Sequence, residues 1–193
     1  MSLSDRIRLK GERLLSDNYG TLKSTTFEWR RNDGQWQTMT RDVFDRGNAA
    51  AILPYNLKRR TVVLVRQFRL PTYLNGYDDL LIEAAAGLLD DASPEDRIRA
   101  EAEEEIGYRL HHVHKVFEAF MSPGAVTEKI HFFVAEYEPE MRIGDGGGLL
   151  DEGEDIEVLE LSFDEALAMI ANGRIVDAKT IMLLQHAALH IFR

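Results

Sequence analysis

Residues 86–108, AGLLDDASPEDRIRAEAEEEIGY, predict a tight loop, then a short helix, then a stop. Ser93 suits the N-cap of the helix, Pro94 suits its first position, and Asp96 stands where a capping acid belongs. Gly107 suits the position just past the helix, where a left-handed backbone favours glycine. We expect the rest of the chain to be organised around this loop and helix.

Three glutamates of this helix share one face, because Glu101, Glu104 and Glu105 stand at i, i+3 and i+4. Glu103 adds a fourth acid on another face. Like charges at this spacing repel each other, and they crowd the helix end at which the dipole also disfavours anions. A divalent cation reverses the sign of these interactions, and carboxylate oxygens suit Mg²⁺ or Mn²⁺. A solvated acidic face without a metal is the alternative.

The segment AEAEEEIGY resembles the second half of the Nudix box, R-E-U-x-E-E-x-G-U, in which U is apolar. The matching residues are Glu101, Ala102, Glu104, Glu105, Gly107 and Tyr108, with Gly87 at the opening glycine. Two positions depart from the pattern: Ala100 replaces the arginine, and the loop after Gly87 is one residue short. The first glutamate of the box therefore has no clean counterpart, and Ser93 and Glu95 are candidates. These departures concern the loop geometry more than the metal site.

The resemblance extends from about Leu15 to Leu184, where many phrases are similar to those of bacterial GDP-mannose pyrophosphatases, relatives of ADP-ribose pyrophosphatases. The phrases include VFDRGNAAAIL, VVLVRQFRLPTYLNG, IEAAAGLLD, FMSPGAVTEKIHFF, GEDIEVLEL and DAKTIMLL. The resemblance implies an α/β (α+β) fold: a Nudix α/β/α sandwich around a mixed sheet, with a small N-terminal antiparallel β extension exchanged across a homodimer. It also implies cleavage of GDP-mannose to GMP and mannose 1-phosphate with Mg²⁺, or with Mn²⁺ in its place.

The resemblance assigns the metal to the Ala86 carbonyl, Glu101 and Glu105, while Glu104 shares a second metal or tunes the first. Glu104 and Glu105 are thus the catalytic acids of the helix. By motif position, the implied substrate contacts are Tyr19, Thr40, Arg41, Asp42, Arg69, Ala86, Gly87, Leu88, Glu128, Gly153 and Lys179. Some contacts from the N-terminal extension are expected to reach the site of the other subunit. For Lys179, a surface lysine at a helix start is the alternative.

Residues 142–155, RIGDGGGLLDEGED, are rich in glycine and acids and are expected to be flexible and exposed. A mobile acidic loop can carry a general base that approaches the metal only with substrate bound. The candidates are Glu152, Glu154 and Asp155, and we favour Glu154, which is also a candidate metal ligand.

The composition is that of an ordinary globular chain of 193 residues, with 45% apolar residues and a net charge of −10. This charge argues against nonspecific binding of nucleic acid or a membrane surface, which needs a basic patch. There is no cysteine, which excludes disulfides and thiolate metal sites. No apolar run approaches the roughly 20 residues that span a bilayer, and the N-terminus lacks the apolar core of a secretory signal. We therefore expect a cytoplasmic protein.

Residues 1–48 are interpreted as an N-terminal β extension and residues 49–193 as the Nudix hydrolase domain. Asp33-Gly34 between alternating runs predicts a hairpin from about Thr21 to Phe44. Such a hairpin is marginal alone and needs a partner surface, either the main domain or a second subunit. Trp29 and Trp36 flank the turn and are expected to pair across it.

Residues 49–55 and 61–69 predict two strands, and the nearly continuous apolar run TVVLV predicts burial on both faces. Arg66 and Arg69 emerge at the end of the second strand, where an arginine can clamp a phosphate; a surface ion pair is the alternative. Further strands follow around residues 116–122 and 129–137, then IEVLELS, and two C-terminal helices complete the chain. The cluster of His111, His112 and His114 has poor spacing for zinc.

Three hypotheses from different classes follow. The first is a nucleotide-sugar pyrophosphohydrolase acting on GDP-mannose, with ADP-ribose as the rival substrate. The second is a catalytically inactive Nudix-fold sensor of nucleotides, which need not retain all three glutamates of the helix. The third is an acidic structural protein that binds no metal.

Overall fold

The computed structural model describes residues 2–193, apart from the side chain of Glu152. The chain divides into two compact units. The first unit contains the residues up to 48 together with 120–129, and the second contains 49–119 and 130–193. Within the described residues, no helix is both long enough and apolar enough to cross a membrane.

The first unit is a three-stranded antiparallel sheet in the order β1-β2-β3, formed by β1 (Ile7–Asp17), β2 (Thr21–Arg30) and β3 (Trp36–Asp45) after a short 3-10 turn, η1 (Leu3–Asp5). The β2–β3 hairpin confirms the turn expected at Asp33-Gly34, where Gly34 has φ 84°. The sequence analysis did not predict β1. Its pairing with β2 contains two irregularities, between Leu9 and Gly11 and between Leu14 and Ser16, which break the two-residue periodicity that marks a strand.

The two tryptophans do not pair with each other, contrary to expectation. Trp29 lies opposite Gln37, and Trp36 lies opposite Arg30. Each indole instead carries an arginine on its face, with the guanidinium carbon of Arg6 4.4 Å from the Trp29 ring centroid and that of Arg8 3.9 Å from the Trp36 centroid. Each tryptophan therefore makes a cation–π contact with an arginine instead of packing against the other tryptophan.

The loop 120–129 is held on β3 by backbone hydrogen bonds. The N–H of Phe44 donates to the Ala125 carbonyl at 2.8 Å, and the N–H of Thr127 donates to the Phe44 carbonyl at 3.1 Å. The Thr127 hydroxyl also donates to Asp45 at 2.8 Å. A segment far along the chain thus belongs to the N-terminal unit.

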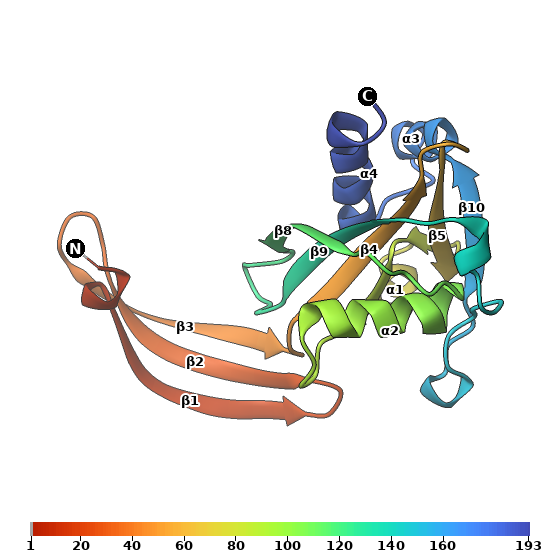
Figure 1. The fold of residues 1–193 in the computed structure, drawn as a ribbon. Helices are drawn as coiled ribbons and strands as arrows, with labels where there is room; N and C mark the ends of the chain where they lie inside the picture. Colours follow the sequence, from red (N-terminus) through yellow and green to blue (C-terminus); the bar gives the residue numbers. More distant parts are fainter. Residues whose placement is uncertain (1) are drawn as a thin grey trace. The chain divides into compact units, whose positions relative to one another are not determined.

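The second unit is a mixed sheet with helices on both faces (Figure 1). Its strands follow the order β10-β5-β4-β9-β8, with β6 on β5 and β7 on β4. The bounds are β4 (Ala49–Asn56), β5 (Thr61–Gln67), β6 (Leu81–Glu83), β7 (Ala85–Leu88), β8 (His114–Phe120), β9 (Lys129–Glu136) and β10 (Glu157–Ser162). The helices are α1 (Leu70–Leu74), α2 (Pro94–Ile106), α3 (Phe163–Ala171) and α4 (Ala178–His190), with 3-10 turns η2 (Pro139–Met141) and η3 (Leu150–Glu152). The pairing of β4 is parallel with β9 and antiparallel with β5, which makes the sheet mixed.

Alternate residues of the central strands pack on opposite sides. Ala50 and Ile52 of β4, with Val63 and Val65 of β5, join one core with the apolar face of α2. The intervening residues of both strands are equally buried, as expected for a strand covered on both faces. Figure 1 shows α2 along one side of this sheet and α3 and α4 on the other. The expected α/β/α sandwich with a mixed sheet is therefore confirmed.

The local signals around α2 are also confirmed. The Ser93 hydroxyl accepts a hydrogen bond from the N–H of Asp96 at 3.2 Å, and Pro94 is the first helical residue. Gly107 ends the helix with φ 73°, and a Cβ there would lie 2.3 Å from the Gly144 carbonyl oxygen. The helix is therefore fixed at both ends, which sets the positions of its glutamates.

Candidate active site

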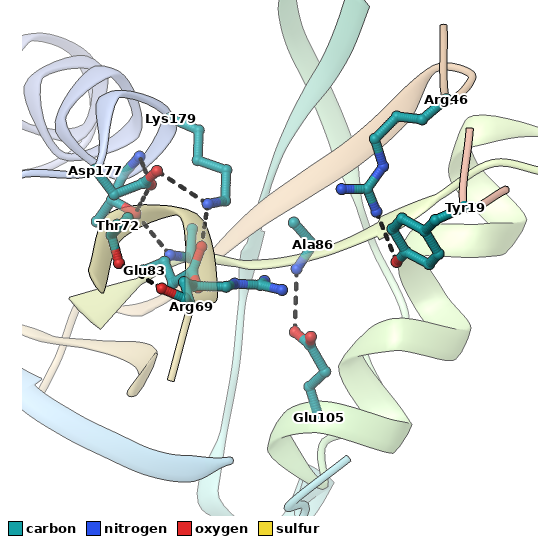
Figure 2. Close-up of polar contacts among 11 residues, drawn as sticks. Tyr19, Arg46, Arg69, Thr72, Glu83, Ala86, Glu105, Asp177 and Lys179 are labelled. Atoms are coloured by element: carbon teal, nitrogen blue, oxygen red, sulfur yellow. Dashed lines mark hydrogen bonds and ion pairs between the residues drawn. The ribbon is translucent and has the colours of Figure 1, made fainter. Parts of the chain in front are cut away.

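The acidic face of α2 lies against β7. Glu105 is only 1% exposed, and its Oε2 accepts a hydrogen bond from the Ala86 N–H at 3.0 Å (Figure 2). Glu101 is 4% exposed and forms an ion pair with Arg97, one turn earlier. Glu104 is half-buried. The helix spacing therefore brings two of the three expected acids into the protein interior.

Gly87 makes room for the Glu101 carboxylate. A Cβ at this position would lie 1.6 Å from Oε1 of Glu101 and 2.2 Å from its carboxyl carbon. No side chain other than hydrogen fits there unless Glu101 moves. The glycine that opens the box-like motif thus leaves the space that the Glu101 carboxylate occupies.

Burial makes ionisation of these acids costly without a counter-ion. Burial and, to a smaller extent, the neighbouring charge of Glu101 together raise the pKa of Glu105 to about 8. Burial also raises the pKa of Glu101 to about 7, although Arg97 acts in the opposite direction. The carboxylate of Glu154 adds to the rise in pKa at both positions, which places the favoured loop acid near the cluster.

The donor set fits a hard divalent cation, since two nearly buried carboxylates and a third on the same helix face gain from a positive charge. The two buried acids are engaged by protein groups, however: Glu101 by Arg97 and Glu105 by the Ala86 N–H, and the loop acid Glu154 is engaged by the Leu149 N–H. In the described residues, no three acidic or histidine side chains already surround a common point as metal ligands do. Oε1 of Glu101 is therefore available to a metal only if it leaves Arg97, whereas Oε2 has no such ion pair within the described part of the chain.

The glycine-rich loop is exposed along most of its described length, as its composition predicted, and part of it is also bound to the end of α2. Gly147 and Gly148 donate backbone hydrogen bonds at 3.0 and 3.1 Å to the last carbonyls of α2, those of Glu105 and Glu104. Gly146, Gly147 and Gly148 all have positive φ, which explains the glycine run. A Cβ at Gly148 would lie 2.4 Å from Oε2 of Glu154, so this glycine seats the carboxylate.

Of the two candidate bases whose side chains the structure describes, Glu154 is the more enclosed. Its Oε2 accepts a hydrogen bond from the Leu149 N–H at 2.8 Å, and its side chain is half-buried. Asp155 is exposed, and so is Gly153, a candidate substrate contact. The side chain of Glu152 lies outside the described part of the chain.

A second charged cluster joins β6 to the starts of α1 and α4 (Figure 2). The Arg69 Nε–H donates to Oε1 of Glu83 at 2.6 Å, and Lys179 forms ion pairs with Glu83 and, at 3.0 Å, with Asp177. Burial lowers the pKa of Lys179, but Glu83 and Asp177 outweigh it and raise this pKa above its usual value. Lys179 is thus an interior cation, which corrects the surface-lysine alternative.

Arg66 does not belong to this cluster. Its guanidinium forms an ion pair with Glu157 of β10, including a hydrogen bond from Nε at 2.8 Å. Both side chains are at least one-third exposed, at 36% and 50%. The ion-pair alternative is therefore the observed arrangement for Arg66, whereas Arg69 has the buried carboxylate of Glu83 as its partner.

The remaining candidate contacts belong to the first unit, apart from Leu88, which lies half-buried on β7. Tyr19 is 77% exposed, and Arg46 holds its ring by a hydrogen bond of 2.9 Å to the hydroxyl and a cation–π contact of 4.7 Å (Figure 2). Thr40, Arg41 and Asp42 are exposed on β3, and Glu128 is half-buried in the loop 120–129. Their roles toward a substrate stay predictions.

Several residues that shape the site were missed from the sequence. Glu83 is a single acid within the apolar run LLIEAAAG, a signal that could have marked a buried ion pair. Asp177 is the N-cap of α4 and accepts from the Thr180 N–H at 2.9 Å, which the pattern Asp-x-x-Thr permits. Arg46 had no recognisable local signal.

Comparison with known families gives two matches that together cover most of the chain. The model described as "GDP-mannose pyrophosphatase NudK N-terminal domain" matches residues 6–44. The model described as "NUDIX domain" matches residues 45–184. The boundary between them falls just before β4, where the second unit begins.

Curated relatives match over nearly their full length. The chain is 54% identical to a GDP-mannose pyrophosphatase of Pectobacterium atrosepticum, covering 96% of this chain and 95% of the relative. A protein of the same name from Cronobacter sakazakii is 51% identical, with 97% of each covered. A solved structure described as an ADP compounds hydrolase superposes with a TM-score of 0.73, covers 97% of both chains and is 16% identical, a likeness that shows the fold alone.

Proposed function

Because this chain belongs to the NUDIX-domain family, we propose that it is a pyrophosphohydrolase that cleaves GDP-mannose to GMP and mannose 1-phosphate. The observation that carries the proposal is the 54% identity over 96% of the chain to a protein named GDP-mannose pyrophosphatase. That match includes the N-terminal unit, for which the family model also names GDP-mannose pyrophosphatase.

The proposed cofactor is Mg²⁺, with Mn²⁺ as a substitute. Its proposed ligands are Glu101, Glu105 and the Ala86 carbonyl, assisted by Glu104 and Glu154. When bound, a divalent ion neutralises negative charge on the diphosphate and lowers the pKa of water. The support from this chain is the burial of two of these acids at a position where only glycine leaves room for the Glu101 carboxylate.

The chain's own residues then divide the work by charge. Arg69 and Lys179 supply positive charge to the diphosphate oxygens, which gather charge as the bond to the leaving phosphate breaks. Glu154 accepts the proton of the attacking water, because its Oε2 is anchored by the Leu149 N–H while a carboxylate retains further acceptor capacity. The oxygen of that water forms the new bond to one phosphorus of the diphosphate. The bond from that phosphorus to the bridging oxygen breaks, and the bridging oxygen leaves as part of the other product, either the sugar phosphate or the nucleotide.

We further propose that Tyr19, Thr40, Arg41 and Asp42 contact the substrate within a homodimer that exchanges its N-terminal sheets. In support, β1 exposes the apolar side chains of Leu9, at 69%, and other leucines to solvent. Size-exclusion chromatography with light scattering measures the dimer directly. A cytoplasmic location stays a prediction from the sequence.

The experiment compares the release of GMP from GDP-mannose with the release of AMP from ADP-ribose in Mg²⁺, with product identification. The proposal expects GMP release to be the faster. Slower GMP release assigns the enzyme to ADP-ribose instead. Binding of either compound without any turnover, in a preparation that folds, supports the sensor hypothesis.

A further inference from the structure

We propose that Glu83 is a positioning residue that holds Arg69 and Lys179 as one clamp for the diphosphate. The inference rests on the proposed function and deepens it. Glu83 ends β6, is 2% exposed, and shares its carboxylate between the two cations: Oε1 accepts from Arg69, and Oε2 pairs with Lys179. One buried anion thus fixes two cations that are distant in sequence.

Counting donors shows which parts of the cations stay available. An arginine has five N–H groups, and the Glu83 contact takes only the one on Nε. Within the described residues, no hydrogen bond is found at the two outer nitrogens of Arg69, and the side chain is 40% exposed. These outer nitrogens form the fork that binds phosphate oxygens in pairs. Arg69 is therefore held at its inner nitrogen and presents its outer edge.

Lys179 is held more completely. Its ammonium has three N–H groups, of which Glu83 and Asp177 account for two. Its side chain is only 12% exposed. One donor remains for a phosphate oxygen, so Lys179 contributes a fixed charge where Arg69 contributes a two-pronged contact.

The anchor of the clamp is rigid because several backbone segments meet there. Asp177 accepts from the Thr180 hydroxyl at 2.6 Å, and the same hydroxyl accepts from the Ala84 N–H at 2.7 Å. The backbone next to Glu83 is thereby tied to the first turn of α4, which carries Lys179. Arg69 stands directly before α1, where the Thr72 hydroxyl donates to its carbonyl at 2.8 Å.

The clamp faces the glutamate cluster. Figure 2 shows the Arg69 guanidinium extending from Glu83 toward Ala86, whose N–H binds Glu105. Two cations and two carboxylates, those of Glu83 and Asp177, leave the clamp close to neutral before substrate binds. A bound diphosphate then supplies an anionic partner for the outer nitrogens of Arg69, which have none among the described residues. Glu83 sets where this charge is received, without contacting the substrate.

The test uses the full chain in four forms: wild type, Glu83→Gln, Arg69→Ala and the double variant. Two quantities are measured: kcat/KM for GDP-mannose, and the affinity for GDP by titration calorimetry without divalent ions. Glu157→Gln is the matched control, because it removes the carboxylate from the exposed Arg66 pair in the same unit. Circular dichroism confirms folding of each form.

Displacement of a positioned group by an ångström costs on the order of 100-fold in rate, so Glu83→Gln should lower kcat/KM by about 100-fold. GDP affinity should fall as well, and Glu157→Gln should change neither quantity. In the Arg69→Ala background the Glu83→Gln effect should be smaller, since one of the two residues through which Glu83 acts is gone and only Lys179 remains. If Glu83 had a merely structural role, the fold-losses of the two single variants would multiply in full in the double variant.

If Glu83→Gln does not fold, Glu83→Asp replaces it, since that variant keeps the charge but is too short to reach both cations; the same losses are expected. Values within about twofold of wild type for either folded variant, or fully multiplicative effects, overturn the inference. A wild-type enzyme that releases no GMP contradicts the proposed function instead. An active wild type with unaffected Glu83 variants overturns only the clamp.

Discussion

Replacing Gly87 with alanine should remove activity while leaving the fold intact. The added Cβ would lie 1.6 Å from Oε1 of Glu101, whereas ordinary contact begins at 3.4 Å, so the carboxylate must shift by about 1.8 Å. Since a displacement of about 1 Å in a catalytic group can cost 100-fold, kcat should fall by at least about 100-fold. Gly87 has no positive φ, so the backbone accepts alanine without strain.

The assay is steady-state release of GMP from GDP-mannose at saturating Mg²⁺, together with thermal unfolding of the same preparations. Gly144→Ala is the matched control, because a Cβ there meets nothing within 4 Å and its φ is ordinary. The control should retain wild-type turnover. Full activity in Gly87→Ala would refute the reasoning that Glu101 must occupy this position, and global unfolding of the variant would refute the statement that only the carboxylate moves.

Three further predictions concern the same unit. The pKa of Glu105 rises from 4.5 to about 8 on folding, so its contribution to the stability of the metal-free protein is full below pH 4.5 and is lost as the pH rises toward 8. One pKa unit corresponds to about 1.4 kcal/mol, so the free energy of unfolding of Glu105→Gln should exceed that of wild type by roughly 3 kcal/mol at pH 7 in EDTA. Urea unfolding measures this difference. The same variant should lose most turnover. Gly148→Ala should slow turnover, measured as kcat, because its Cβ would displace Glu154 and its φ of 77° disfavours alanine. Arg66→Ala should leave kcat/KM nearly unchanged, whereas Arg69→Ala should lower it by about 100-fold or more. If both arginines bound the diphosphate, both variants would lower kcat/KM.

Local signals in the sequence predicted the parts of the fold that depend on few neighbouring residues. The caps of α2 at Ser93 and Gly107 and the turn at Gly34 each lie within five residues of their partners, so the local sequence specifies them. The helical spacing likewise predicted that Glu101 and Glu105 would share a face.

The arrangements that were missed depend on partners distant in the chain. Glu83 meets Arg69 across 14 positions and Lys179 across 96, and no periodicity reports such pairs. Composition likewise does not reveal that the N–H groups of Gly147 and Gly148 cap the end of α2. Tertiary contacts turned a loop-like sequence into a fixed support for Glu154.

The central claim is that the acids of α2 hold a divalent ion between the helix and β7. Anomalous diffraction from crystals grown with Mn²⁺ and GDP tests it most directly. We expect an anomalous peak bounded by Glu101, Glu105 and the Ala86 carbonyl. A peak elsewhere, or none, in an enzyme that turns over would contradict this claim.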